Sequence, residues 1–183
     1  MKGDLEEILY TANQIQDRVQ ALAKQIAIDY KGKNPLLVGV LKGAVIFMAD
    51  LARYLDIPLE MDFMAISSYG MSTESSGVVR IMKDLDRPIE NRDVLIVEDI
   101  VDSGLTLQYL RDLLVRRQAR SVKIAAAFDK PGGRKVDIAP DYYGLTVPNR
   151  FLVGYGLDFA EHYRNLPFVG ALKESVYKDL IHR

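Results

Sequence analysis

The sequence predicts an α/β protein with a mostly parallel, twisted sheet flanked by helices, and three observations lead to this prediction. Short apolar runs of strand length alternate with segments of helical periodicity. Several runs are unbroken series of Val, Leu and Ile, which is typical of strands buried on both faces of a parallel sheet. No repeat, linker or low-complexity tract interrupts them, so residues 1–183 are expected to form a single domain.

The first half of the chain is predicted to hold two helices and three strands. Apolar residues recur every three or four positions over residues 5–26, which predicts an amphipathic helix. Residues 35–41 predict a buried strand and residues 44–55 a helix. Residues 59–66 alternate apolar with acidic side chains, and the apolar run 78–82 follows without an intervening helix. These two strands are expected to form an antiparallel hairpin at one edge of the sheet.

The second half is predicted to add strands at residues 94–99, 122–128 and 151–153. The first of these leads directly into two adjacent carboxylates, Glu98 and Asp99. Ligands of parallel sheets bind at the carboxyl ends of strands, where this pair is expected to lie. The pair is therefore a candidate for binding a polyol or a metal ion, although solvated residues that close a strand would look the same.

The segment Asp102-Ser103-Gly104-Leu105-Thr106 predicts a turn that opens a helix. Such a turn offers backbone N–H groups, hydroxyls and the positive end of the helix dipole to an anion. Asp102 or Ser103 could instead simply cap the helix. Capping does not require Gly104 and Thr106 in the same turn beside two carboxylates, so the set favours a site for a phosphorylated sugar.

Further chemistry follows other predicted strands. Lys42 and Gly43 lie between a predicted strand and a predicted helix. Taken alone, this pattern is equally typical of a helix start with a solvated lysine. Lys130 precedes a Pro-Gly-Gly turn that an ordinary surface loop would share. Residues 151–158 and 161–167 combine aromatic, acidic and basic side chains, and an aromatic-rich core strand would explain part of this pattern.

Composition limits the class of protein. Hydrophobic residues make up 49% of the chain and charged residues 27%, which is ordinary for a soluble globular protein. A formal net charge of −1 gives no electrostatic reason to expect a nucleic-acid partner. The chain has no cysteine, which excludes disulfides and thiolate metal sites. Without a signal-peptide pattern or an apolar stretch of membrane-spanning length, a cytoplasmic protein with no membrane partner is expected.

The segment 94–106 resembles the phosphoribosyl pyrophosphate (PRPP) binding motif of type I phosphoribosyltransferases: an apolar strand, Glu-Asp, two apolar residues, Asp-Ser-Gly, one residue and Thr. The other segments match the 6-oxopurine branch of this family, in its order, from Leu41 to Pro167. The resemblance implies the family's fold, with a small hood and a flexible catalytic loop. It also implies purine salvage: transfer of the 5-phosphoribosyl group from PRPP to N9 of hypoxanthine and/or guanine, giving IMP or GMP and pyrophosphate.

The resemblance assigns the residues around PRPP. Glu98 and Asp99 hold the ribose hydroxyls, directly or through Mg²⁺, and the backbone and side chains of the turn wrap the 5′-phosphate. The phosphate-binding residues are Asp102, Ser103, Gly104, Leu105 and Thr106. The pyrophosphate-binding residues are Lys42, Gly43 and Arg164. The metal-binding residues are Glu98, Asp99 and Asp158. A catalytic loop over residues 67–77, including Ser68 and Tyr69, is expected to close the site against water.

The resemblance also assigns the purine site. Phe151 stacks on the base, Lys130 faces its 6-oxygen, and backbone groups at Leu152 and Asp158 face its 2-position. Asp102 is the catalytic residue, because it is placed to accept or hold the proton at purine N7. An ammonium group donates hydrogen bonds and cannot accept them, so Lys130 favours a 6-oxo group over the 6-amino group of adenine.

Two hypotheses of other kinds stay open at this point. One is a regulator on the same fold that senses PRPP or nucleotides and binds RNA, DNA or a protein, since a fold alone does not fix function. The other keeps the enzyme class but changes the base, with xanthine the hardest to exclude. Synthesis of IMP from hypoxanthine and PRPP would distinguish an enzyme from the regulator. Reaction rates with the purified bases would distinguish the possible base substrates. The family implies a homodimer or homotetramer, and the sequence does not decide between them.

Overall fold

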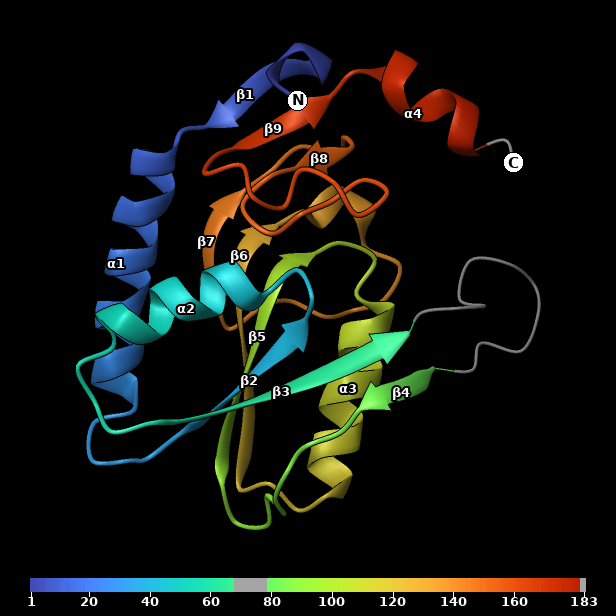
Figure 1. Cartoon of the computed structure of the whole chain (residues 1–183). Helices are drawn as coiled ribbons and strands as arrows, with labels where there is room; N and C mark the ends of the chain where they lie inside the picture. The colour runs from blue at the N-terminus through green and yellow to red at the C-terminus, as the bar shows by residue number, and fades with distance from the viewer. Residues whose placement is uncertain (68–78, 182–183) are drawn as a thin grey trace.

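A six-stranded, mostly parallel sheet forms the centre of the molecule (Figure 1). The computed structural model describes residues 1–67 and 79–181. The strand order is β4-β3-β2-β5-β6-β7, with β4 antiparallel to β3 and every other pair parallel. The strands are β2 Leu36–Leu41, β3 Glu60–Ser67, β4 Arg80–Lys83, β5 Asp93–Val101, β6 Ser121–Asp129 and β7 Tyr142–Thr146. The predicted fold class and the edge hairpin are confirmed.

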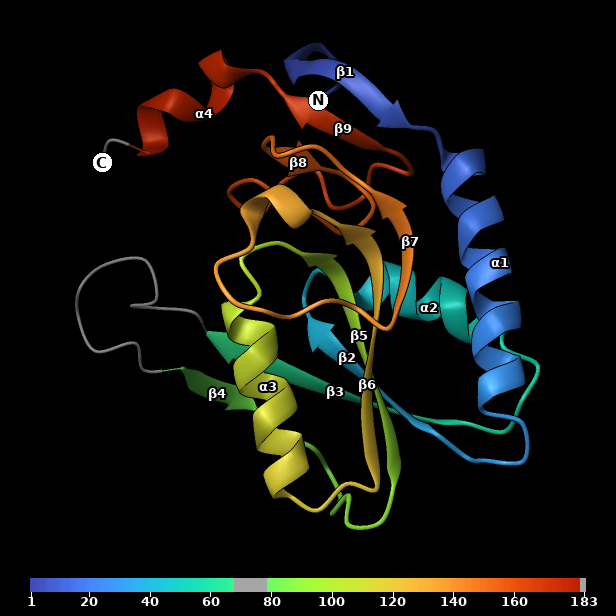
Figure 2. The same cartoon turned by 180° about the vertical axis from the view of Figure 1, so that it is seen from behind.

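Helices cover both faces of this sheet, which explains the unbroken apolar runs. Helices α1 Ala12–Asp29 and α2 Val45–Tyr54 lie on one face and α3 Leu105–Arg116 on the other (Figures 1 and 2). In β5, Leu95 and Val97 belong to the core shared with α1 and α2, whereas Val94 and Ile96 belong to the core shared with α3. Because both faces are buried, every residue of this run is apolar.

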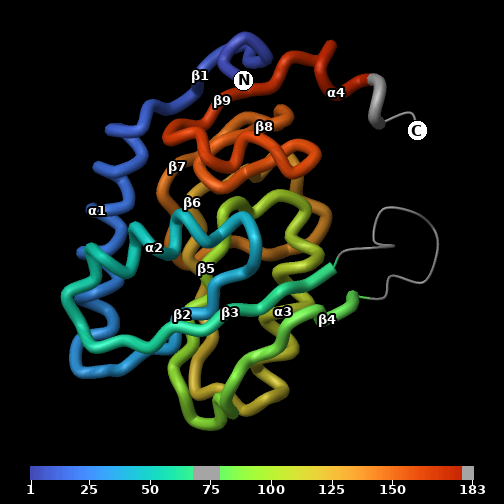
Figure 3. The backbone as a smooth tube through the Cα atoms, in the orientation of Figure 1, coloured from blue at the N-terminus to red at the C-terminus, as the bar shows by residue number. Residues whose placement is uncertain are grey.

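A small second sheet lies beyond the carboxyl ends of β5 and β6 (Figure 1). It contains β1 Leu5–Tyr10, β9 Val169–Leu172 and β8 Leu152–Val153 in the order β1-β9-β8. Helix α4 Glu174–Ile181 follows β9, so the N-terminal segment and α4 lie at the same end of the molecule (Figure 3). This sheet corresponds to the expected small hood. Among the described residues, no helix is long and apolar enough to cross a membrane.

The helix predicted over residues 5–26 is wrong in its first part, because residues 5–10 form strand β1. This strand pairs with β9 through two register irregularities, which break the strict alternation of a strand and leave apolar residues three or four apart. The helix starts at Ala12 behind a capping box: Gln14 N donates to Thr11 Oγ1 at 3.3 Å and Thr11 N donates to Gln14 Oε1 at 2.9 Å. Strands β7 and β9 and helix α4 were not predicted.

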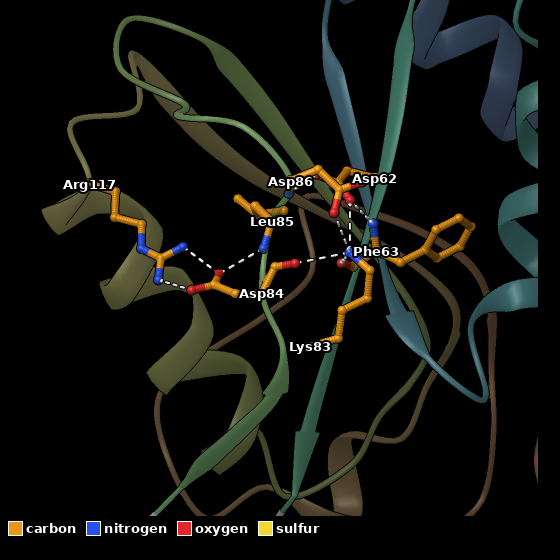
Figure 4. A network of polar contacts seen from close by, with 7 residues as sticks. All are labelled: Asp62, Phe63, Lys83, Asp84, Leu85, Asp86 and Arg117. Carbon is orange, nitrogen blue, oxygen red and sulfur yellow. Dashed lines mark hydrogen bonds and ion pairs between the residues drawn. The ribbon is translucent and has the colours of Figure 1, made fainter.

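Polar contacts anchor the segment after β4 (Figure 4). Lys83 Nζ lies 3.2 Å from both Asp62 Oδ1 and Asp86 Oδ1, and Asp86 N donates to Asp62 Oδ2 at 2.8 Å. Arg117 at the end of α3 holds Asp84 through two bonds of 2.6 and 2.7 Å. Asp62 is buried, so its carboxylate is the centre of this network.

We expect Asp62→Ala to lower the free energy of unfolding by about 1–3 kcal/mol, because it removes the buried carboxylate that accepts hydrogen bonds from Asp86 N, Phe63 N and Lys83 Nζ. Urea unfolding compared with the wild type measures this loss. Asp56→Ala, the same change at an exposed residue, is the control and should be near neutral. Equal midpoints for the two variants would show that the network does not stabilise the fold.

Candidate active site

Two adjoining hollows lie at the carboxyl ends of the central strands. The larger, of about 520 Å³, is lined by Asp99, Ile100, Asp102, Lys130, Asn149, Arg150, Phe151, Leu152, Leu157, Asp158 and Tyr177. The smaller, of about 220 Å³, is lined by Glu98, Asp99, Ile100, Val101, Asp102, Ser103, Gly104, Thr106 and Leu107. All four residues predicted to bind a purine line the larger hollow. The residues predicted to bind phosphate, except Leu105, line the smaller one. Asp99, Ile100 and Asp102 form the boundary that the two hollows share.

The turn beside the smaller hollow is built around a glycine. Gly104 has φ +81°, and a Cβ there would lie 2.4 Å from Ile138 Cγ2, so a side chain is excluded by both conformation and space. Helix α3 begins at Leu105, whose N–H lies 3.5 Å from Ser103 Oγ. The first N–H groups of a helix have no partner within it. The turn therefore has the form of an anion site.

Asp102 does not cap the helix, because its carboxylate pairs with Lys130. The two charged atoms, Asp102 Oδ2 and Lys130 Nζ, are 2.6 Å apart, and the lysine side chain is only 12% exposed. Gly133 packs against the same carboxylate: a Cβ at this position would lie 1.8 Å from Asp102 Oδ1. The turn after β6 therefore lies directly on the turn after β5.

Arg134, which sequence reasoning missed, braces this contact. Its Nη1 donates to the carbonyl oxygen of Asp102 at 2.6 Å, and its Nε donates to that of Ile138 at 2.8 Å. It also pairs with Asp129 at the end of β6. The one signal in the sequence is a basic residue after a Pro-Gly-Gly turn, and this signal does not distinguish a brace from a solvated side chain.

Glu98 and Asp99 lie within β5, which continues to Val101 and pairs there with β6. The prediction that the strand ends at residue 99 is corrected by this pairing. Burial raises the pKa of Glu98 well above its ordinary value, and the charge of Asp99 adds to the effect. Burial also raises the pKa of Asp99 to about 6, although the hydrogen bond from Ile100 N and the positive charge of Arg164 act to lower it. The pair therefore holds a proton far more readily than free carboxylates do.

Glycines bring three segments together beside Asp99. A Cβ on Gly43 would lie 1.7 Å from Asp99 Oδ2, and a Cβ on Gly156, which has φ +98°, would lie 2.1 Å from the carbonyl oxygen of Gly43. The Leu41–Lys42 peptide bond between β2 and this loop is cis. No side chain fits at either glycine, so the backbone itself forms the wall next to the carboxylates.

The cations predicted to bind pyrophosphate are both paired with acidic residues. Lys42 Nζ lies 2.6 Å from Glu161 Oε2, and Arg164 Nη2 lies 2.9 Å from Asp158 Oδ1 and 3.3 Å from Glu161 Oε1. Arg164 Nη1 donates to the carbonyl oxygen of Gly156 at 2.8 Å. Its Nε is buried with no hydrogen-bond partner among the described residues. Glu161 was missed because its partner Lys42 comes from a segment far away in the sequence.

A buried carboxylate behind the site holds the loop of Gly156. Tyr155 has φ +50°, and its hydroxyl donates to Asp50 Oδ2 at 2.7 Å. Gln16 Nε2 donates to the same oxygen at 2.6 Å. Tyr155 is buried, as the alternative of aromatic core residues within 151–158 expected. Asp50 is a further residue that the sequence did not reveal.

The predicted metal and loop residues are not brought together as a group. Among the described residues, no three His, Cys, Asp or Glu side chains cluster in a way that could hold a metal ion. Asp158 faces Arg164 instead of joining Glu98 and Asp99 in such a cluster. Ser68 and Tyr69 lie outside the described residues.

Comparison with known proteins identifies the family. Residues 6–160 match the model of the phosphoribosyl transferase domain. The chain belongs to the phosphoribosyltransferase family. The hypoxanthine-guanine phosphoribosyltransferase of Bacillus subtilis is 55% identical over 178 residues, which cover 97% of this chain and 99% of that protein. A crystal structure of a hypoxanthine phosphoribosyltransferase from Staphylococcus aureus has a TM-score of 0.93 at 48% identity, covering 97% of this chain and 96% of that chain.

Other phosphoribosyltransferase relatives are longer. The bifunctional protein TilS/HprT of Listeria monocytogenes is 52% identical over 179 residues, which cover 98% of this chain and 28% of that protein. The chain thus spans about a quarter of the length of such bifunctional relatives and nearly all of the Bacillus subtilis one.

The raised pKa of Asp99 predicts a pH dependence of stability in the protein without ligands. Its folded-state pKa of about 6 exceeds the ordinary 3.8, so the stabilisation present at low pH is lost as the pH rises through about 6. Asp99→Asn should therefore raise the Tm at pH 7.5, by a few degrees, and change it much less at about pH 4, close to the ordinary pKa. A Tm difference between variant and wild type that is the same at both pH values would contradict the shift; Asp56→Asn is the control.

Proposed function

We propose that this phosphoribosyltransferase transfers the 5-phosphoribosyl group from PRPP to N9 of hypoxanthine and/or guanine, giving IMP or GMP and pyrophosphate in purine salvage. One observation carries the proposal: Asp102 stands on the boundary between an anion-binding turn and a cleft that holds Lys130 and Phe151. A nucleoside monophosphate has a phosphate at one end and a base at the other, and this boundary separates sites of matching chemistry. The relatives named for hypoxanthine and guanine support the choice of base.

The Asp102–Lys130 pair matches one edge of a 6-oxopurine. The ammonium offers only donors and the ionised carboxylate only acceptors. A 6-oxopurine presents an O6 acceptor next to an N7–H donor, so one base satisfies both groups together. Adenine places its 6-amino donor opposite the ammonium and offers it no acceptor, which is costly because the Lys130 side chain is largely buried. Phe151 supplies a stacking surface, and the backbone of Leu152 and Asp158 faces the 2-position.

In this proposal, PRPP binds to the turn that opens α3 and to the backbone wall at Gly43 and Gly156. The turn Asp102, Ser103, Gly104, Leu105 and Thr106 holds the 5′-phosphate with helix N–H groups. Glu98 and Asp99 hold the ribose hydroxyls. Lys42, Gly43 and Arg164 hold pyrophosphate. The negative groups of PRPP would replace the carboxylates that now pair with Lys42 and Arg164.

The residues present fit a Mg²⁺ ion that arrives with PRPP. Two crowded carboxylates with raised pKa values are favourable partners for a cation. Mg²⁺ commonly uses one or two carboxylates together with substrate phosphates and water, so a closed protein cluster is not required. Glu98, Asp99 and Asp158 are the proposed ligands, directly or through water. When bound, the ion would offset charge that builds on the leaving pyrophosphate.

The chain's own residues then guide the transfer. The C1′–O bond breaks ahead of full attack by N9, so positive charge develops on the ribose beside Glu98 and Asp99. Asp102 accepts or holds the proton at N7 and makes the base more nucleophilic. Phe151 and Lys130 fix the orientation of the base, which keeps N9 aligned with C1′. Ser68 and Tyr69 are proposed to exclude water while the charge is exposed.

We further propose that the enzyme acts in the cytoplasm as a homodimer or homotetramer, with the catalytic unit in residues 1–183. The near-neutral net charge of −1 supports small-molecule substrates over a nucleic-acid partner. Gel filtration with light scattering distinguishes the two oligomers.

The base specificity tests the proposal. Purified protein with PRPP and Mg²⁺ should convert hypoxanthine and guanine to IMP and GMP, and adenine less efficiently by several powers of ten. Lys130→Gln should narrow this preference, because its amide offers either a donor or an acceptor. The measurement is kcat/KM for hypoxanthine, guanine, xanthine and adenine. Absence of any nucleotide product would favour the regulator, and efficient use of adenine would remove Lys130 from base selection.

The role of Asp102 is tested separately. Asp102→Asn should lower kcat by about 10²-fold or more, within the usual range for general acid–base catalysis, while affinity for PRPP is largely kept. Asp56→Asn controls for the loss of one surface charge. Turnover close to wild type would reduce Asp102 to a structural partner of Lys130.

A further inference from the structure

The last described helix contributes an aromatic ring to the cleft. Tyr177 of α4 stacks on Phe151, with ring centroids 5.0 Å apart and planes inclined by 22°. Phe159 meets Phe151 edge-on, at 5.3 Å and 88°. Tyr177 and Phe151 both line the larger hollow, together with Lys130 and Asp158. No local pattern predicts this contact, because 26 positions separate the two residues in the chain.

The spacing excludes a base between the two rings. Rings with centroids 5.0 Å apart are already in stacking contact, so Phe151 and Tyr177 would have to separate to admit another ring. A base that stacks on Phe151 without this separation uses the surface that Tyr177 does not cover. Phe151 is itself tied down at its backbone, where its carbonyl oxygen accepts from Leu172 N at 2.9 Å. Binding of a base would therefore restrict the side-chain rotamers of Phe151 and not its backbone.

From this geometry we infer that Tyr177 is a positioning residue for the purine: it fixes the plane of the Phe151 ring on which the base stacks. A partly exposed phenylalanine facing an open cleft can adopt several rotamers, and binding a base would otherwise have to order it. Stacking against Tyr177 orders the ring before the base arrives, which improves affinity by preorganisation. The inference rests on the proposed function, since it needs a base on Phe151.

The contact is held by α4 packing on the small sheet. Val176 and Tyr177 pack against the apolar cluster that includes Leu172 of β9 and Phe168. The start of the helix is tied to the N-terminal segment, where Lys173 N donates to the carbonyl oxygen of Asp4 at 2.9 Å. The small sheet thus delivers Phe151 and Tyr177 to the same place from two separate segments.

The test is a split between the two substrates. Tyr177→Ala should raise KM for hypoxanthine roughly two- to tenfold, the range of an aromatic pair, and leave KM for PRPP unchanged. Tyr177→Phe should behave like wild type, because the ring and not its hydroxyl makes the stack. Tyr177→Leu keeps apolar bulk without the ring and should show the same rise in KM for hypoxanthine. It is the variant to use if the Tm of Tyr177→Ala falls below that of the wild type. Lys178→Ala, at an exposed neighbour, is the control.

Each other result contradicts the inference. An unchanged KM for hypoxanthine would make the stack irrelevant to the base, and a lowered KM would show that Tyr177 competes with the base for Phe151. An equal rise in both KM values would show a general loss of structure. Wild-type protein that makes no IMP would refute the proposed function itself, whereas active wild type with an unaffected Tyr177→Ala refutes only the role of Tyr177.

Discussion

The ion pair between Asp102 and Lys130 is the interaction on which the candidate site depends. It joins the turn after β5 to the turn after β6 and so fixes the boundary between the two hollows. Gly133 leaves space for the carboxylate, and Arg134 ties the two turns together from behind. A largely buried ammonium needs such a partner, because an unpaired charge there would be expensive. The pair is therefore both a structural contact and the proposed reader of the base.

The other cationic side chains of the candidate site also have acidic partners within the protein. Lys42 pairs with Glu161, Arg164 with Asp158 and Glu161, and Lys130 with Asp102. In the proposed reaction, each substrate group replaces one of these internal carboxylates. Breaking the internal ion pairs lowers the affinity for the substrates. The same ion pairs keep the charged side chains aligned when no substrate is bound. Glu98 and Asp99 are the exception, since they repel each other and hold a proton in place of a cation.

Local patterns predicted the parts of the molecule that local chemistry determines. The apolar run of β5, the carboxylates in its last part and the glycine turn at Gly104 are all set by neighbouring residues, and each was recognised in the sequence. The N-terminal strand was mistaken for helix because its irregular pairing with β9 spaces apolar residues as a helix does. Contacts such as Glu161 with Lys42 and Tyr177 with Phe151 join distant segments. No spacing rule reveals them, because they depend on how the small sheet is placed over the large one.

A double-mutant cycle of Asp102→Asn and Lys130→Gln measures whether these two residues act on the base as one unit. The quantity is kcat/KM for hypoxanthine in the wild type, both single variants and the double variant. We expect the double variant to lose at least about tenfold less kcat/KM than the product of the two single losses, which corresponds to a coupling of about 1.4 kcal/mol or more. Losses that simply multiply would contradict this expectation, because they would show that Asp102 and Lys130 contribute independently.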